Sequence, residues 1–147
     1  MKKSIMSSNL SYHKLMVPSN TVCLRPDMDV PLFTYTKGEP NVKLNKPLRL
    51  EPNTNHKYFC FLGIRTKGIH SSFHITTVKF YPKHNLIIYF DSLGPQNVVH
   101  IKQDIINHIV TIFSLTKQPK FIHNINVYQQ PQQKNCMDWC LKDLNIN

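Results

Sequence analysis

The chain has 147 residues, of which 41% are hydrophobic, and a formal net charge of +10. This length suits one soluble globular domain, because a chain of this size can form a single hydrophobic core without disulfide bonds or bound metal. The hydrophobic content excludes disorder of the whole chain. No window approaches the roughly 18 apolar residues of a membrane span, and the N-terminal segment lacks the apolar core of a signal peptide. We therefore expect an intracellular protein, without a membrane partner, whose four cysteines are reduced.

The N-terminal third is rich in proline. Residues 1–50 hold five of the ten prolines, with only short apolar segments between them. Proline is confined to edge strands, bulges and loops, so this stretch is expected to be an irregular arm with one or two edge strands. Residues 51–147 are expected to form the core, and the whole chain a single domain.

Four segments of the core have strand patterns. Residues 58–64 form a continuous apolar run, and residues 74–81 alternate between two faces. Residues 82–85, with the sequence PKHN, are a turn by composition, so 74–81 and the apolar run 86–91 should pair as an antiparallel hairpin. A fourth, alternating segment covers residues 121–128.

Two segments have helical patterns. Residues 98–115 carry one apolar stripe, formed by Val98, Ile101, Ile105, Ile109, Ile112 and Phe113. A shorter helix should begin near Cys136, because Trp139, Cys140 and Leu144 recur after it at helical spacing. The order strand, strand, strand, helix, strand, helix predicts an α+β domain with a small, mostly antiparallel sheet packed with helices.

The predicted hairpin brings a histidine and an aspartate together. His74 opens one strand and Asp91 closes the other, so antiparallel pairing places them opposite each other within one register step. An imidazole beside a carboxylate is the base and orienter that a thiol nucleophile needs. Cys136 is the candidate nucleophile, because the N-terminus of a helix lowers the pKa of a thiol.

The spacing of these residues resembles that of the adenain-type cysteine endopeptidases and, more distantly, the proteases of ubiquitin-like modifiers. The acid follows the histidine by seventeen residues, and a glutamine precedes the nucleophile by seven. The remaining matches are Pro82, Gly94, Pro131, Trp139 and Cys140, together with the modifier-protease sequence Asp91-Ser92-Leu93. The resemblance covers roughly residues 58–144 and is ungapped from His74 to Gly94.

The resemblance implies a peptidase that works through a thioester intermediate on viral precursor proteins or the C-termini of ubiquitin-like modifiers. Cys136 would attack the scissile carbonyl, His74 would act as its base and Asp91 would orient the imidazole. The side-chain amide of Gln129, with the backbone N–H of Cys136, would donate to the oxyanion. No cofactor or metal is implied, and a viral member would work in the host nucleus or the virion.

Three departures from the family pattern accompany these matches. The family usually has glycine after the nucleophile, where this chain has Met137, and commonly tryptophan after the histidine, where this chain has Ile75. The chain also stops eleven residues after Cys136. Compared with the family, we therefore expect a core truncated after the nucleophile helix, and a decayed protease fold that acts as a non-catalytic binding module is an alternative.

The sequence leaves other chemistry open. His70 and His74 are four residues apart, as are Cys136 and Cys140, and two histidines with two cysteines could hold zinc. Cys140 also competes as nucleophile, because Gln133 precedes it by seven residues. Cys136 is favoured, since it should lie in the first helical turn, where free N–H groups stabilise a thiolate.

The basic charge predicts a partner as well. A net charge of +10 on a chain of this size predicts affinity for polyanions, most simply non-specific binding of nucleic acid. The candidate phosphate contacts are Lys79, Lys83, Lys117 and Lys120.

Overall fold

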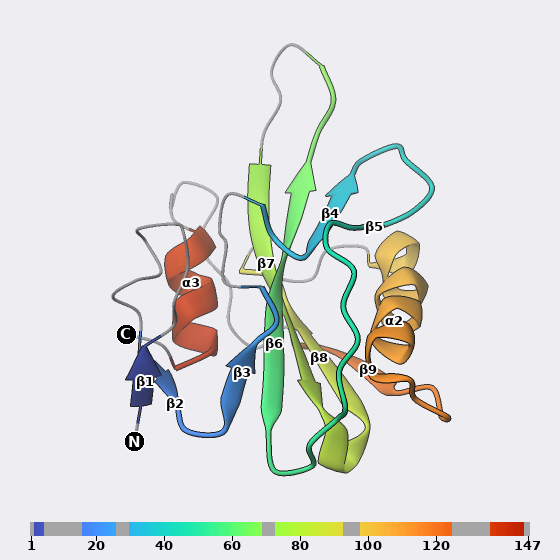
Figure 1. Cartoon of the computed structure of the whole chain (residues 1–147). Helices are drawn as coiled ribbons and strands as arrows, with labels where there is room; N and C mark the ends of the chain where they lie inside the picture. The colour runs from blue at the N-terminus through green and yellow to red at the C-terminus, as the bar shows by residue number, and fades with distance from the viewer. Residues whose placement is uncertain are drawn as a thin grey trace.

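A mixed β-sheet lies between two helices, which cover its opposite faces (Figure 1). The structure is a computed structural model that describes residues 2–4, 16–25, 30–68, 73–92, 98–124 and 136–145. Helices and strands thus form one α+β arrangement, as the sequence predicts. Within the described ranges, the helices are α2 (Val99–Phe113) and α3 (Cys136–Asp143).

The main sheet has seven strands. In sheet order, six of them are β5 (Lys43–Leu44), β4 (Phe33–Thr36), β6 (Lys57–Arg65), β7 (Phe73–Tyr81), β8 (Leu86–Phe90) and β9 (Lys120–Asn124). The seventh, β3 (Thr21–Cys23), pairs with β6 beside β4, so that the two short strands share one edge of β6. Strands β1 (Lys2–Ser4) and β2 (Met16–Pro18) form a separate antiparallel pair.

The sheet is not mostly antiparallel, so this part of the prediction was wrong. Strands β3 and β4 run parallel to β6, and β9 runs parallel to β8, which makes three of the six pairings parallel. The helix α2 connects β8 to β9 as a crossover, and such a connection returns the chain in the same direction. The N-terminal segment also contributes three strands to this sheet, rather than the predicted one or two.

The predicted hairpin is confirmed. Strands β7 and β8 pair in antiparallel register from Thr77↔Phe90 to Tyr81↔Leu86. A single 3-10 turn, Pro82–His84, joins them and ends at Asn85 in the left-handed conformation, which asparagine tolerates. The hairpin therefore places the start of β7 beside the end of β8.

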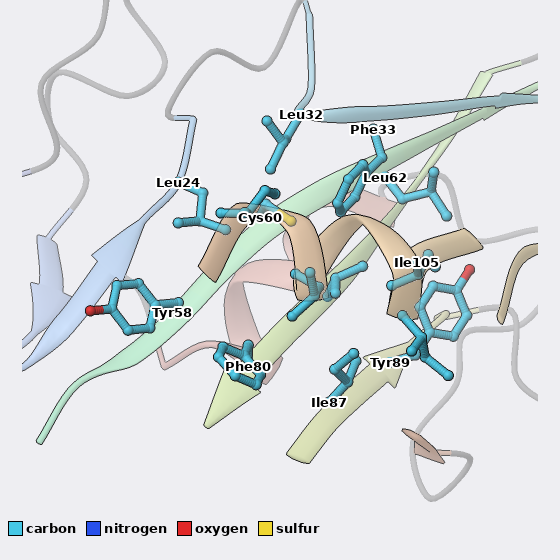
Figure 2. Close-up of a cluster of buried hydrophobic side chains, with 14 of the residues drawn as sticks. Leu24, Leu32, Phe33, Tyr58, Cys60, Leu62, Phe80, Ile87, Tyr89 and Ile105 are labelled. Carbon is cyan, nitrogen blue, oxygen red and sulfur yellow. The ribbon is translucent and has the colours of Figure 1, made fainter. Parts of the chain in front are cut away.

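The face of the sheet under α2 holds the larger core. The buried residues of α2 are Ile101, Ile105, Ile106, Ile109, Ile112 and Phe113, close to the predicted stripe. Figure 2 shows the strand side chains that surround them, among them Leu62, Phe80, Ile87 and Tyr89. Burial of this apolar face holds α2 on the sheet.

The opposite face holds a smaller core under α3, which packs on β7. Its buried members are Phe59, Phe61, Ile75, Met137, Cys140 and Leu144. Met137 is buried where Trp139 is only half-buried, so the apolar face of this helix is rotated from the predicted one. Met137, which stands where the peptidases that the sequence resembles usually have glycine, is thus part of the core.

Candidate active site

His74 and Asp91 form the first contact of the site, as the hairpin register predicts. Nε2 of His74 lies 2.6 Å from Oδ1 of Asp91. The His74 side chain is 19% exposed and that of Asp91 is 2% exposed. A buried carboxylate that contacts one ring nitrogen fixes both the orientation of the imidazole and its tautomer.

Cys136 completes the cluster, with its sulfur near the His74 ring. It is the first residue of α3, and its Sγ accepts a hydrogen bond of 3.3 Å from the backbone N–H of Ile75. Its sulfur also lies close enough to the His74 ring to shift the pKa of both groups. Nε2 of the same ring contacts Asp91. Asp91, His74 and Cys136 therefore form a continuous chain of contacts.

The contacts shift both pKa values in the direction that an activated thiol requires. Burial by itself lowers the pKa of His74, but its hydrogen bonds and charge interactions with Asp91 and Cys136 outweigh burial and raise the pKa to about 9. Burial raises the pKa of Cys136, but the bonds from His74 and the Ile75 N–H outweigh it, and the net pKa is lowered. These directions favour an imidazolium–thiolate pair near neutral pH.

The backbone of Ile75 distinguishes Cys136 from Cys140. The ladder between β7 and β8 ends at Thr77, so the N–H and C=O of Ile75 lie beyond it. The N–H donates to Cys136 Sγ, whereas the C=O accepts a bond of 3.4 Å from the Cys140 thiol. Burial raises the pKa of Cys140 well above its usual value. The geometry therefore favours Cys136 as the residue that ionises.

Several predicted positions lie outside the described residues. These are the predicted oxyanion donor Gln129, the competing Gln133, and the positions of His70, Gly94 and Pro131. Among the residues that are described, no group of three or more His, Cys, Asp or Glu is arranged to hold a metal ion. The cysteines, all four of which are described, are free thiols.

A second polar cluster anchors the far end of α3. Nζ of Lys79 lies 2.9 Å from Oδ2 of Asp143, and the two side chains are 8% and 10% exposed. The Thr77 hydroxyl donates to the same oxygen at 3.2 Å. Lys79 was therefore wrongly predicted as a phosphate contact, because its ammonium group is buried and paired, whereas Lys83, Lys117 and Lys120 are exposed.

Sequence reasoning missed the contributions of Ile75 and Asp143. Ile75 contributes its backbone, and no residue type signals that a peptide group will contact a thiol. The ion pair had a readable signal, since Lys79 interrupts an apolar strand face and Asp143 ends a helix, where a negative charge opposes the dipole. A charged residue at such an unfavourable position often pairs with an opposite charge from another element of the fold.

Fold and site together define an α+β protein with a Cys–His–Asp cluster at one end of its sheet. The chain is similar to uncharacterized protein 082L of Invertebrate iridescent virus 6, with 27% identity over 149 residues that cover 99% of this chain and 94% of that protein. No protein-family model and no solved structure matches the chain. Across the described part, no helix has the length and apolar character needed to cross a membrane.

Proposed function

We propose that the chain is a cysteine endopeptidase of the adenain type. The observation that carries the proposal is the chain of contacts from Asp91 through His74 to Cys136, with the sulfur at the first residue of a helix. A buried acid, an imidazole and a thiol in this order have the geometry of a nucleophile, its base and the group that orients the base.

The proposed reaction uses the three residues in these roles. The Cys136 thiolate attacks the scissile carbonyl, and the backbone N–H of Cys136, with Gln129 by resemblance, donates to the oxyanion. The protonated His74 gives its proton to the leaving amine as the C–N bond breaks, which leaves a thioester. A water molecule, whose proton passes to His74, then attacks the thioester and releases the acid and the thiolate.

The proposed substrates are viral precursor proteins or the C-termini of ubiquitin-like modifiers. Similarity along nearly the whole chain to an iridescent-virus protein supports the first class. We place the proposed activity in the infected cell, in the nucleus or the virion.

The experiment that tests this proposal uses peptide vinyl sulfones with small residues beside the reactive group, in which the electrophilic β-carbon of the vinyl group occupies the position of the scissile carbonyl carbon. We expect one covalent adduct, mapped by mass spectrometry to Cys136, which is absent in Cys136→Ser and in His74→Ala and retained in Cys140→Ser. A vinyl sulfone without a peptide is the control for general thiol reactivity. Equal labelling of Cys136 by both probes, at the rate of a free cysteine, would favour the non-catalytic module.

A nucleic-acid-binding role is a second candidate, and it is compatible with the first. The exposed Lys83, Lys117 and Lys120 lie at one end of the sheet, where Asn85 hydrogen-bonds the backbone of both Lys117 and Lys120. This is the end of β7 opposite His74. A ligand could therefore bind there without blocking the site.

A further inference from the structure

A row of paired residues leads across the sheet from Cys136. Ile75, whose N–H contacts the sulfur, pairs with Gly63 of β6, and Gly63 pairs with Thr34 of β4. Thr34 in turn pairs with Lys43 of β5. Paired residues present their side chains on the same face of a sheet. The row therefore lies on the face that carries α3, because Ile75 belongs to the core under that helix.

The aromatic ring of Phe73 covers part of this row, between Ile75 and the far end at Lys43. The Phe73 ring fills the space above Gly63, where a Cβ atom would clash with it, so only glycine permits the ring to lie against the strand. Phe73 is 48% exposed although it directly precedes His74. The Arg65 guanidinium lies 6.0 Å from the centroid of the same ring. An exposed apolar surface thus lies over Gly63, the residue that pairs with Ile75.

A polar pocket lies at the far end of the row, beyond the Phe73 ring. Its volume is about 450 Å³, and its lining includes Thr34, Thr36, Glu39, Lys43, Asn45 and Arg65. The Asn45 amide is fixed by hydrogen bonds to the Thr34 hydroxyl and the Pro31 carbonyl. Because Thr34 is two strands from Ile75, the pocket begins about 10 Å from the site, a span of about three residues of extended peptide.

The pocket is positively charged. Its one lining carboxylate, Glu39, is paired with Lys67 at 2.5 Å, whereas neither Lys43 nor Arg65 forms a salt bridge in the described part of the chain. Two cations beside hydroxyl and amide groups complement a carboxylate.

We propose that this pocket is a specificity subsite that takes an aspartate or glutamate side chain of the peptide substrate, about three residues from the scissile bond. Lys43 and Arg65 select the acid, and Phe73 supports the peptide between the acid and Cys136. The inference rests on the proposed peptidase function and adds a substrate class to it.

The test uses fluorogenic peptide pools that contain a single acidic residue, an aspartate, placed at a different position in each pool. Pools with asparagine at the same position are the reference. In the wild type, aspartate about three residues from the cut should raise kcat/KM roughly tenfold over asparagine, mainly through KM. The double variant Lys43→Met, Arg65→Met should lose this preference. The matched control Lys37→Met, Lys102→Met removes the same charge from exposed positions outside the pocket and should keep it.

Two further readouts keep the proposals separate. Alkylation of Cys136 by iodoacetamide should be unchanged in the pocket variant, which shows that the catalytic cluster is intact. If no pool is cleaved, the peptidase function fails, and fluorescence anisotropy of the labelled pools on Cys136→Ser protein still tests the pocket. Equal binding of aspartate and asparagine pools, or a preference that survives in the pocket variant, would overturn the subsite.

Discussion

At the scale of single residues, Cys136 and Cys140 contact the backbone of the same residue, Ile75, with opposite polarity. Cys136 accepts a hydrogen bond from the Ile75 N–H, which favours a thiolate, whereas Cys140 donates to the Ile75 C=O, which requires the thiol. Burial also raises the pKa of Cys60 well above its usual value and that of Cys23 to about 12.

Brief alkylation with iodoacetamide near neutral pH should therefore modify Cys136 before the other three cysteines. The expected order follows from the fraction of each thiol that is ionised, and peptide mapping by mass spectrometry reads it directly. An adduct on Cys140 while Cys136 stays free would show that the assignment of the nucleophile is wrong.

The pH dependence of peptide cleavage reports the same pair. Activity should rise with pH as Cys136 ionises below the usual thiol pKa, and fall as His74 loses its proton near its raised pKa of about 9. In His74→Ala the thiolate loses its cationic partner, so the pH midpoint of Cys136 alkylation should move upward and peptide cleavage should fall at least 100-fold. An unchanged alkylation midpoint or undiminished turnover would contradict the pairing.

At the scale of elements, the Lys79–Asp143 pair fixes α3 along β7. Contacts at Ile75 hold the first turn of the helix, and the ion pair holds its last residue. Removing one partner of a buried pair leaves the other charge without compensation, which is strongly destabilising.

We therefore expect Lys79→Met to lower the free energy of unfolding by about 3 kcal/mol and to slow the alkylation of Cys136. The double variant Lys79→Met, Asp143→Leu should recover most of the stability, because neither charge is then buried. Lys142→Met, which changes an exposed residue of the same helix, is the control. Denaturant unfolding measures all three variants, and a Lys79→Met protein as stable as wild type would refute the role of the pair.

The elements also show what periodicity reveals. The hairpin, α2 and the start of α3 were predictable, since long apolar stripes and a PKHN turn identify them locally. Strands β3 and β5 have three and two residues, too few for any period to show. The direction of β9 depends on how α2 crosses the sheet, which the alternation of β9 does not encode.

The residues of the site also differ in how far the sequence could predict their contacts. His74 and Asp91 were predictable as neighbours, because one hairpin register relates them. Cys136 joins them through the packing of α3 on Ile75, from which it is separated by 61 residues of chain, and only the resemblance suggested that contact. Lys79 was misread because its strand face is covered by a helix that strand periodicity does not place.

At the scale of the whole molecule, the net charge of +10, with the exposed Lys83, Lys117 and Lys120 at one end of the sheet, predicts binding of nucleic acid. For single-stranded DNA of mixed sequence, log affinity should fall linearly with log salt concentration. The triple variant Lys83→Ala, Lys117→Ala, Lys120→Ala should reduce this slope by up to about 2, at about 0.7 per phosphate.

Replacement of the exposed Lys37, Lys46 and Lys102 by alanine is the matched control, which changes the net charge equally. Titrations by fluorescence anisotropy at several salt concentrations give both slopes. Affinity that does not depend on salt, or an equal loss of slope in both triple variants, would exclude this end of the sheet as the binding surface.

The most direct measurement of the central claim is cleavage of a diverse peptide mixture, analysed by mass spectrometry. Wild-type protein should generate new termini that share a sequence preference, whereas Cys136→Ser should generate none and Cys140→Ser should cleave like wild type. The Asp91→Asn variant should retain the fold but lose most of the activity. The asparagine side chain can still contact the imidazole, but it carries no negative charge to stabilise the imidazolium. A folded wild-type protein that cleaves no peptide, or a Cys136→Ser protein that cleaves as well as wild type, would contradict the account.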